Sequence, residues 1–348
     1  MNAVLLGYGT VGKGVERLCN QVADLNLTNV FVLPQFEDLP YFTNDGERIV
    51  TDPDTDIVFE CLSGTEPANT LITKALEAGK HVITSNKAVV SPNLERYVEL
   101  AKRYGGSIQI EASVAGGIPF LDAILKLQRL EEIDGYEGIF NGTSNYILDQ
   151  MQKEGVALKD ALKEAQKRGY AEADPTNDIE GIDVFYKTNI TNMLAYQTKN
   201  DAILPPLGIS KIDQGNAFAS VIAPAFLDEE NYLANTPSNY NAQLLFANSF
   251  DQLGYFGQGA GQLATAQAML ANALDTMEHR ERKIVLNNDK KVDNSILQED
   301  WIVRSKKDLA SLMPAKQENE YFLFEKKDPT FIATVQEIDP EAMIALWK

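Results

Sequence analysis

The residues from Gly169 to Lys187 combine acidic side chains with one lysine in a way that could support proton transfer. The segment reads GYAEADPTNDIEGIDVFYK, and five acids precede the lysine: Glu172, Asp174, Asp178, Glu180 and Asp183. Asp183 and Lys187 are spaced i,i+4, so on a helix through residues 181–195 they share one face, where the acid would orient the lysine and favour its charged form. Since the chain has only two histidines, its proton chemistry would rest on lysine or carboxylates.

Two simpler interpretations of this segment stay open on spacing alone. An Asp–Lys pair at i,i+4 is most often a surface salt bridge that contributes about 0.3–0.5 kcal/mol to stability. An acid-rich turn with a proline and a glycine is also typical of a calcium loop, although DPTNDIEGID lacks the ligand spacing of an EF-hand. Other motifs of the chain are needed to choose between these interpretations.

Length and composition set the broad class of the protein. The 348 residues are 44% hydrophobic, and 31 basic against 50 acidic side chains give a net charge of −19. This length suits two or three domains, and the acidity argues against nucleic-acid binding, which needs a basic surface. No apolar run approaches the roughly 20 residues that cross a bilayer, and no signal peptide is visible. The two cysteines, Cys19 and Cys61, favour reduced thiols and a cytoplasmic location.

The first third of the chain is typical of a dinucleotide-binding fold. An apolar run, AVLLG, leads into Gly7, Gly9 and Gly12, and a helical pattern follows. In this setting Gly7 permits a tight turn, Gly9 lets the backbone approach a pyrophosphate, and Gly12 lets helix and strand pack closely. Strands are predicted in TDIVFECL, HVITS and SIQIEAS, with helices at 66–78 and 91–105 between them. This alternation predicts an α/β fold with a Rossmann-type, doubly wound parallel sheet.

One part of the dinucleotide fingerprint is missing. Proteins that bind NAD usually carry an acid about 20 residues after the glycines, at the end of the second strand. Here the predicted second strand, NVFVL, ends in Pro34 and Gln35, and the first acids are Glu37 and Asp38, slightly late. No arginine stands nearby to favour a 2′-phosphate. The sequence therefore leaves NAD and NADP both open.

The middle of the chain contains more specific sequence motifs. They are EASVAGGIPF, GIFNGTSNYIL and AEADPTNDIEGIDVFYK. Together with GYGTVGKG, GTEPA and HVITSNKAVV, they resemble the homoserine dehydrogenase family over roughly residues 1–275, in order and at matching spacings. Members of that family reduce L-aspartate 4-semialdehyde to L-homoserine with a nicotinamide cofactor, on the branch that leads to threonine and methionine. The resemblance thus implies an NAD(P)-dependent oxidoreductase of amino-acid biosynthesis.

The resemblance also implies roles for individual residues. Lys187 would be the catalytic lysine, with Asp183 beside it, and Lys87 would lie beside the nicotinamide and the substrate. The implied substrate contacts are Gly169, Tyr170, Glu172 and Asp178. The implied cofactor contacts are Gly7, Gly9, Thr10, Val11, Gly12, Ser63, Gly64, Asn86, Lys87 and Gly259. The implied ligands of a monovalent cation, Na⁺ or K⁺, are Glu111, Val114, Gly116 and Ile118.

The chemistry of the implied reaction agrees with these residue types. Hydride delivery to an aldehyde carbon places negative charge on the carbonyl oxygen, which needs a cation or an acid within hydrogen-bond reach. Because no suitable histidine is present, the Lys187 ammonium is the expected donor. The amino-acid end of the substrate carries its own ammonium, and Glu172 and Asp178 would complement that charge.

The resemblance implies two domains and a symmetric assembly, and local patterns add a third part. The two domains are a dinucleotide-binding domain at 1–115 completed by the helix near 262–276 and an α+β substrate-binding and dimerisation domain at 116–261. The third part is a small C-terminal α+β extension at 280–348. The expected assembly is a homodimer or homotetramer. The phrase NGTSN is expected either to contact the substrate through Asn141, Thr143 or Asn145, or to form a turn with a helix cap.

The C-terminal extension is predicted from local patterns alone. DWIVR, EYFLFE and TFIATV are predicted as short strands, and KKDLASLM and PEAMIALW as helical. This order suggests a reduced version of the amino-acid-binding regulatory module found at some C-termini of the family. The glycine turn expected after its first strand is missing, so a packing or assembly role is the alternative.

Two regions are shorter than the family pattern. One lies between the first helix and TDIVFECL, and the other follows GISKID, where a strand is expected to be absent or merged into NAFASVIAPAFL. They motivate one competing function, a non-catalytic NAD(P)-binding sensor. A second alternative is a dehydrogenase of another amino-acid-derived aldehyde that shares the nucleotide domain. An acyl-forming dehydrogenase would need a nucleophilic cysteine, and Cys19 and Cys61 are predicted inside a helix and a buried strand.

Overall fold

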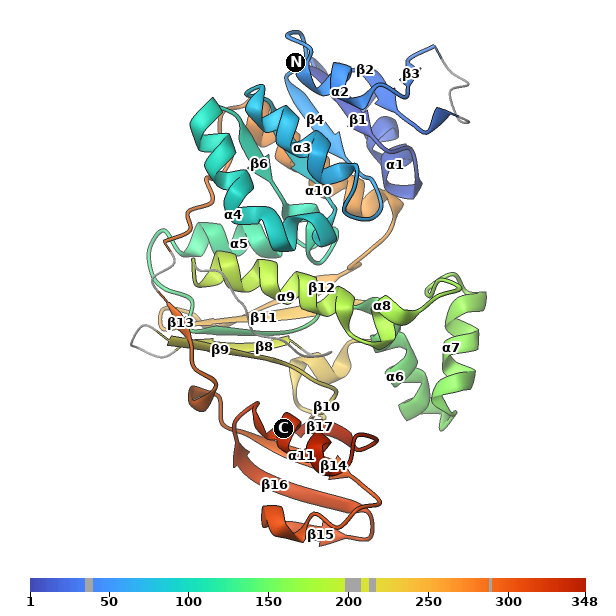
Figure 1. Ribbon diagram of the computed structural model, residues 1–348, viewed down its shortest axis with the longest axis vertical. Helices are drawn as coiled ribbons and strands as arrows, with labels where there is room; N and C mark the ends of the chain where they lie inside the picture. The colour runs from blue at the N-terminus through green and yellow to red at the C-terminus, as the bar shows by residue number, and fades with distance from the viewer. Residues whose placement is uncertain (35–39, 198–207, 213–216, 288–289) are drawn as a thin grey trace. The chain divides into compact units, whose positions relative to one another are not determined.

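The computed structural model describes residues 1–34, 40–197, 208–212, 217–287 and 290–348 of the chain (Figure 1). These residues form two compact units. Unit 1 comprises Met1–Arg129, Asn189–Leu194 and Gly257–Leu286, and unit 2 comprises Leu130–Thr188, Ala195–Phe256 and Asn287–Lys348. Within the described part of the chain, no helix has both the length and the apolar character needed to span a bilayer.

Unit 1 is built on a six-stranded parallel sheet. Its strands are β1 (Asn2–Leu6), β2 (Asn26–Phe31), β3 (Phe42–Thr43), β4 (Ile57–Glu60), β5 (His81–Thr84) and β6 (Ser107–Gln109). They lie in the order β3-β2-β1-β4-β5-β6, and all neighbours pair in parallel. The order reverses between β1 and β4, and doubly wound folds bind their ligands outside the carboxyl ends of the strands at such a point. The predicted Rossmann-type sheet is confirmed.

Helices pack against this sheet because alternate strand residues are apolar on both faces. The helices are α1 (Thr10–Cys19), α2 (Gly46–Thr51), α3 (Ala68–Glu77), α4 (Lys87–Tyr104), α5 (Phe120–Leu127) and α10 (Gln262–Met277). On one face, Val15 of α1 and Met269 of α10 join Leu5 and Phe59 in a single buried cluster. Val58, which alternates with Phe59 along β4, is also fully buried.

Among the boundaries in unit 1 that differ from the sequence prediction, two have a clear local cause. Helix α4 begins at Lys87 rather than near residue 91, because the side chain of Asn86 accepts the N–H of Val89 (3.3 Å) and caps an earlier turn. The strand predicted for SIQIEAS ends at Gln109, and a 3-10 helix, η2 (Glu111–Ser113), follows. There the buried carboxylate of Glu111 turns to accept backbone N–H groups at the start of α5.

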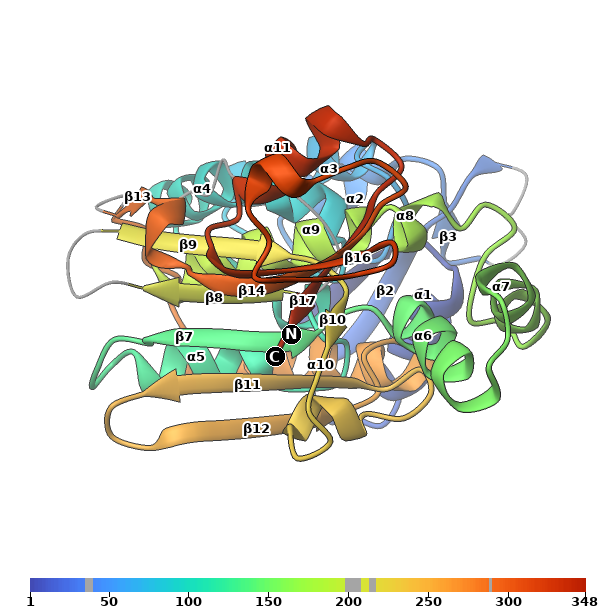
Figure 2. The ribbon, with the colours of Figure 1, turned by 90° about the horizontal axis from the view of Figure 1, so that it is seen from below.

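Unit 2 is built on a second six-stranded sheet. Its strands are β7 (Gly135–Ile139), β8 (Gly208–Ile212), β9 (Ala217–Ile222), β11 (Asn241–Ala247), β12 (Asp251–Gly257) and β13 (Lys291–Val292). Figure 2 shows five of them side by side, in the order β12-β11-β7-β8-β9. GISKID and NAFASVIAPAFL contribute β8 and β9, which pair antiparallel, and the loss or merging of a further strand between them stays a prediction. Asp213, at the end of GISKID, lies outside the described residues.

Four helices accompany this sheet in the chain. They are α6 (Gly142–Glu154), α7 (Leu158–Lys167), α8 (Thr176–Ile179) and α9 (Ile182–Ala195). The N-terminal half of α9 packs on β7, where the hydroxyl of Tyr136 donates to the carbonyl of Thr188 at 3.2 Å. The ring of Tyr136 also stacks on that of Tyr196, just after α9. These contacts hold the helix that carries Asp183 and Lys187 against one face of the sheet.

The C-terminal residues form a small module within unit 2, with a five-stranded sheet in the order β10-β17-β14-β16-β15. Its elements are β10 (Ala225–Phe226), β14 (Glu299–Arg304), β15 (Lys316–Glu318), β16 (Tyr321–Lys327), α11 (Phe331–Ile338), β17 (Met343–Trp347) and the 3-10 helices η4 (Asn294–Ile296) and η5 (Ala310–Leu312). Another 3-10 helix of unit 2, η3 (Tyr232–Asn235), packs against β11, where Leu233 joins Ala242 and Leu244. The strands predicted in DWIVR and EYFLFE are confirmed. The core of the module joins Trp301 and Phe324 to Val221 of β9, a packing contact within unit 2.

Three predictions in this module are wrong. TFIATV forms the helix α11 rather than a strand, because Phe331, Ile332 and Val335 are buried with helical spacing. PEAMIALW forms β17, which pairs with β14 along its whole length. KKDLASLM forms only the single turn of η5. The β-branched residues of TFIATV favour a strand locally, and tertiary packing overrides that preference.

Candidate active site

Lys187 and Asp183 form a buried ion pair on α9. The Lys187 Nζ lies 2.7 Å from Asp183 Oδ2 and donates to the main-chain carbonyl of Phe140, also at 2.7 Å. Only 8% of Lys187 and 6% of Asp183 is exposed. A buried pair of this kind is not the solvent-exposed bridge that the spacing alone leaves possible, since taking both charges out of water costs several kcal/mol per ion.

Asn141 connects this pair to a third predicted residue. Its Nδ2 donates to Asp178 Oδ1 at 2.7 Å and to Asp183 Oδ2 at 2.8 Å. Its Oδ1 accepts the N–H of Ser144 at 2.7 Å and so caps α6. Burial raises the pKa of Asp178, the bond from Asn141 lowers it, and the negative charge of Asp183 raises it. The structure thus brings Asp178, Asp183 and Lys187 together around one amide.

The other acids of the segment lie apart from this group. Glu172 and Glu180 are exposed. Asp174 is exposed too and accepts the N–H and the hydroxyl of Thr176, at 3.1 and 2.5 Å, at the start of α8. Asp178 and Asp183 therefore lie with Lys187, whereas the other three acids of the segment are exposed.

The remaining predicted substrate contacts lie at the end of α7. Gly169 is exposed and left-handed, with φ 76°. Tyr170 packs edge-on against Tyr146, and its carbonyl accepts the hydroxyl of Thr143 at 2.6 Å. The side chain of Asn145 donates to three carbonyls of residues 236–240. In NGTSN, Asn141 and Thr143 thus contact predicted site residues, whereas Asn145 holds a neighbouring loop.

Two polar groups in this part of unit 2 are missing from the sequence prediction. One is the carbonyl of Phe140, which no side-chain pattern can reveal. The other is Asn241, the first residue of β11, which precedes Ala242, the partner of Ile139 on β7. Asn241 is 1% exposed, and both polar atoms of its side chain lack a hydrogen-bond partner among the described residues. A buried amide usually has a partner, so Asn241 is an exception to that pattern.

The glycine turn of unit 1 has the shape that a pyrophosphate requires. Gly7 has a φ of 93°, which favours glycine. A Cβ at Gly12 would lie 2.1 Å from the carbonyl oxygen of Gly7, so helix and turn are in direct contact. A Cβ at Gly9 would meet no atom within 4 Å. Thr10 begins α1 and is exposed, and Val11 is half-buried. The open space at Gly9 and the N-terminus of α1 fit a bound phosphate group.

The other predicted cofactor contacts follow β4 and β5. Ser63 and Gly64 are exposed in the loop after β4, and the Asn86 Nδ2 donates to the carbonyl of Gly64 at 2.8 Å. Lys87, the first residue of α4, is half-buried. These segments leave the carboxyl ends of neighbouring parallel strands, so they lie at one edge of the sheet together with the glycine turn.

Several predicted features bear less directly on this edge. Gly259 packs against Gly116, where a Cβ would lie 2.7 Å from the Gly259 carbonyl. Gln35, Glu37 and Asp38, on which the choice between NAD and NADP partly depends, lie outside the described residues.

Cys61 follows β4 directly rather than lying within it, and burial raises its pKa well above the usual range. A thiol with a raised pKa is a poor nucleophile.

The predicted cation loop is tightly folded. Burial raises the pKa of Glu111 well above its usual range, and the nearby charge of Asp122 raises it further. The Glu111 carboxylate accepts the N–H groups of Leu121 at 3.2 Å and Asp122 at 2.5 Å. Val114 and Ile118 are buried, and Gly116 has a φ of 56°. Among the described residues, no group of three or more His, Cys, Asp or Glu side chains could hold a metal ion.

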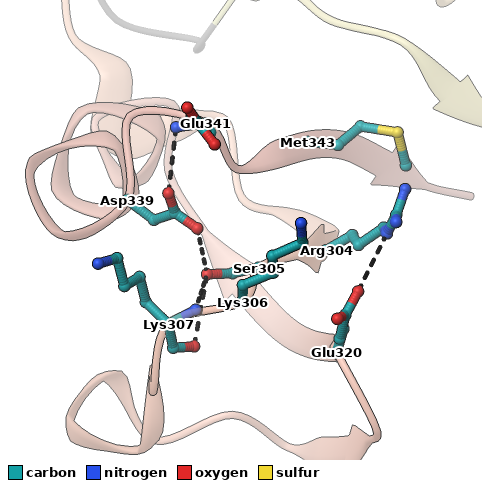
Figure 3. Close-up of a pocket in the computed structure, with 8 residues that line it drawn as sticks. All are labelled: Arg304, Ser305, Lys306, Lys307, Glu320, Asp339, Glu341 and Met343. Carbon is teal, nitrogen blue, oxygen red and sulfur yellow. Dashed lines mark hydrogen bonds and ion pairs between the residues drawn. The ribbon is translucent and has the colours of Figure 1, made fainter.

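A cavity of about 480 Å³ lies in the C-terminal module (Figure 3). It is lined by residues outside the predicted site: Arg304, Ser305, Lys306, Lys307, Glu320, Asp339, Glu341 and Met343. The Asp339 carboxylate accepts the hydroxyl of Ser305 at 2.6 Å and the N–H of Glu341 at 3.1 Å. The bond from Ser305 lowers the pKa of Asp339. The buried polar groups of the wall therefore bond to each other rather than form a reactive site.

The two glycines of the turn predict separable effects of an added methyl group. Gly12→Ala is expected to destabilise unit 1 by about 1–3 kcal/mol, because the new Cβ overlaps the Gly7 carbonyl. Gly9→Ala is expected to leave the unfolding temperature unchanged and to weaken dinucleotide binding, since its Cβ occupies the approach of the pyrophosphate. Thermal unfolding and fluorescence titration with NADH and NADPH measure both. Equal unfolding and equal affinity in the wild type and Gly9→Ala would contradict the assignment of this turn.

Comparison with known proteins gives matches to both the first third of the chain and its middle part. The family model described as homoserine dehydrogenase matches residues 119–220 and 207–274, and the model of the homoserine dehydrogenase NAD-binding domain matches residues 7–111. The homoserine dehydrogenase of Neisseria gonorrhoeae is 34% identical over 312 residues, which cover 79% of this chain and 72% of that protein. The enzyme of Bacillus subtilis is 30% identical over 323 residues, with 82% and 74% covered.

Solved structures give the same result. The crystal structure of a homoserine dehydrogenase from Thiobacillus denitrificans superposes with a TM-score of 0.86 at 27% identity, over 100% of this chain and 98% of that one. A hyperthermophilic archaeal homoserine dehydrogenase in complex with NADPH, at 21% identity and a TM-score of 0.70, shares the fold over 81% of this chain and 99% of that one. The chain therefore belongs to the homoserine dehydrogenase family, the NAD(P)-dependent oxidoreductases that interconvert L-homoserine and L-aspartate 4-semialdehyde.

Proposed function

We propose that Lys187 is the catalytic residue that donates a proton to the substrate's carbonyl oxygen, and that Asp183 holds the Lys187 side chain in position. The observation that carries this proposal is the buried Lys187 Nζ, held at 2.7 Å by both the Asp183 carboxylate and the Phe140 carbonyl. In the reductive direction the ammonium stabilises and protonates the oxygen on which charge develops. In the oxidative direction the same nitrogen takes the proton of the hydroxyl group.

The amino-acid end of the substrate is held by carboxylates. Asp178, half-buried and fixed by Asn141, accepts hydrogen bonds from the substrate ammonium, and Glu172 adds a second acid from the surface of the loop. Gly169 and Tyr170 complete this wall. Charge-assisted hydrogen bonds of this kind are about twice as strong as neutral ones and would select an amino acid over a simple alcohol.

The cofactor is NAD or NADP, bound by the edge of the unit 1 sheet. Gly7, Gly9, Thr10, Val11 and Gly12 hold the pyrophosphate, and Ser63, Gly64, Asn86, Lys87 and Gly259 line the remainder, with Lys87 as a second catalytic cation. When bound, the nicotinamide supplies or accepts the hydride. The main chain of Glu111, Val114, Gly116 and Ile118 would hold Na⁺ or K⁺, because oxygen ligands suit such hard cations. The active assembly is a homodimer or homotetramer in the cytoplasm.

Replacement of Asp178 by asparagine tests the substrate half of this proposal. Loss of a hydrogen bond to a charged group is worth about 1.5–3 kcal/mol, so KM for L-homoserine is expected to rise by at least about ten-fold in Asp178→Asn. Initial rates of NADH and NADPH formation from L-homoserine measure this and also compare the two cofactors. Asp174→Asn is the matched control, because Asp174 lies in the same loop and is exposed. An unchanged KM in Asp178→Asn would contradict the amine contact, and dinucleotide binding without any turnover in the wild type would favour a sensor.

A further inference from the structure

A carboxylate at the end of β4 lies at the centre of a buried hydrogen-bond network in unit 1. Glu60 is fully buried, with 0% of its surface exposed. Its Oε1 accepts the N–H of Leu62 at 2.8 Å, and its Oε2 accepts the hydroxyl of Thr84 at 2.5 Å. The Asn86 Nδ2 lies 3.5 Å from the same carboxylate. One side chain thus links the ends of two neighbouring strands, β4 and β5, to the segments that follow them.

Asn86 extends this network to the loop after β4. Its Nδ2 donates to the carbonyl of Leu62 at 3.1 Å and to that of Gly64 at 2.8 Å. Its backbone N–H donates to Thr84 Oγ1 at 3.0 Å. Through Glu60 and Asn86, the N–H and the carbonyl of Leu62 and the carbonyl of Gly64 are all fixed. A loop whose main-chain groups are bonded in this way has one conformation in place of many.

The same network sets the start of α4. The Asn86 Oδ1 accepts the N–H of Val89 at 3.3 Å, and Lys87 is the first residue of the helix. The loop after β4 also contacts the glycine turn, since a Cβ at Gly7 would lie 2.9 Å from the carbonyl oxygen of Cys61. The network therefore supports the edge of the sheet at which the order of strands reverses between β1 and β4.

The cost of burying the Glu60 carboxylate indicates that its hydrogen bonds are needed at the end of β4. Burial raises its pKa to about 7, and the bonds from Thr84, Leu62 and Asn86 only partly offset that rise. Replacing the carboxyl group by an apolar side chain would relieve the cost of its burial. An acid is nevertheless present in the otherwise apolar run IVFECL. Its benefit must come from the groups that it holds.

We propose that Glu60 is a positioning residue for the cofactor, fixing the loop at residues 61–65 and the N-terminus of α4 in the conformation that binds the dinucleotide. This inference rests on the proposed cofactor site. Glu60 acts through main-chain groups and Asn86, and it needs no contact of its own with the dinucleotide.

Two substitutions of Glu60 separate shape from hydrogen bonding. Glu60→Leu keeps most of the volume and leaves the N–H of Leu62 without its acceptor. Its dissociation constants for NADH and NADPH, measured by fluorescence titration, are expected to rise by about ten-fold or more. Glu60→Gln keeps an oxygen for Leu62 and a polar group for Thr84, so its affinity is expected to stay within about three-fold of the wild type. KM for L-homoserine is expected to change little in either variant.

Val82→Ala is the matched control for lost stability. Val82 is fully buried on β5, adjacent to β4, and its side chain has no group that could hydrogen-bond to the loop. Its truncation is expected to lower the unfolding temperature without changing dinucleotide affinity. If Glu60→Leu does not fold, Thr84→Val decides, with a predicted loss of affinity of at least about three-fold for the missing hydroxyl.

The outcomes separate this inference from the proposed cofactor site. A wild type that binds neither NADH nor NADPH would contradict the site itself. A wild type that binds, together with a folded Glu60→Leu of equal affinity, would overturn only the role of Glu60. A loss in Val82→Ala as large as that in Glu60→Leu would also overturn it, because affinity would then follow stability alone.

Discussion

Lys187→Ala is expected to lower kcat for L-homoserine oxidation by at least about 10²-fold, the usual scale for losing a general acid–base group. The reason is local: the Lys187 Nζ is held at 2.7 Å by both Asp183 and the Phe140 carbonyl, and replacing lysine with alanine removes the ammonium. The steady-state rate of NAD(P)H formation measures the loss. Circular dichroism and thermal unfolding establish that the variant is folded.

Two further variants make this result specific. Lys167 also pairs with an acid on a helix, but its side chain is 79% exposed, so Lys167→Ala is expected to retain the wild-type rate. Lys187→Arg keeps a positive charge, yet a guanidinium does not give up its proton, so it is expected to remain impaired. A wild-type kcat in Lys187→Ala, or equal losses in Lys167→Ala and Lys187→Ala, would contradict the assigned role.

The second large effect concerns stability. Asp183→Ala is expected to destabilise the protein by about 3–5 kcal/mol, because it leaves the buried ammonium of Lys187 without its carboxylate. Asn141 loses an acceptor in the same variant, which adds to the cost. Urea unfolding of the wild type and Asp183→Ala, followed by circular dichroism, measures the difference.

A double variant tests the cause of that loss. Lys187→Met with Asp183→Asn removes both charges and keeps an oxygen for the Asn141 amide. Its stability is expected to return to within about 1 kcal/mol of the wild type, while its activity stays lost. If the double variant is as unstable as Asp183→Ala, the uncompensated charge is not the cause, and the lost hydrogen bonds between Lys187, Asp183 and the Phe140 carbonyl would explain the loss instead.

The features that the sequence predicts best are those with a local physical signal. Gly7, Gly9 and Gly12 lie between an apolar run and a helical pattern, so the turn and the Rossmann-type sheet follow from them directly. The i,i+4 spacing of Asp183 and Lys187 predicts that they meet on one helix face, and their side chains do meet. The spacing does not predict that this pair is buried, because its burial depends on β7 and on the aromatic residues packed against α9.

The features that the sequence does not predict depend on distant contacts. TFIATV has the composition of a strand, yet it is helical because Phe331 and Val335 are buried together in the core of the C-terminal module. The surroundings of Glu60 and Asn241 depend on neighbouring strands of the sheet, and strand pairing sets which strands those are. Of five acids in one segment, charge alone does not say that Asp178 and Asp183 share the amide of Asn141 while Glu172 is exposed.

The central claim is that Lys187 acts in the chemical step, and a first-turnover experiment tests it most directly. Preformed complexes of NADPH or NADH with the wild type and with Lys187→Ala are mixed rapidly with L-aspartate 4-semialdehyde, and the loss of nicotinamide absorbance is followed. The account predicts a first-turnover rate at least about 10²-fold lower in Lys187→Ala, with dinucleotide affinity within about three-fold of the wild type. A wild-type first-turnover rate in the variant, with any slowing confined to later turnovers, would contradict the account.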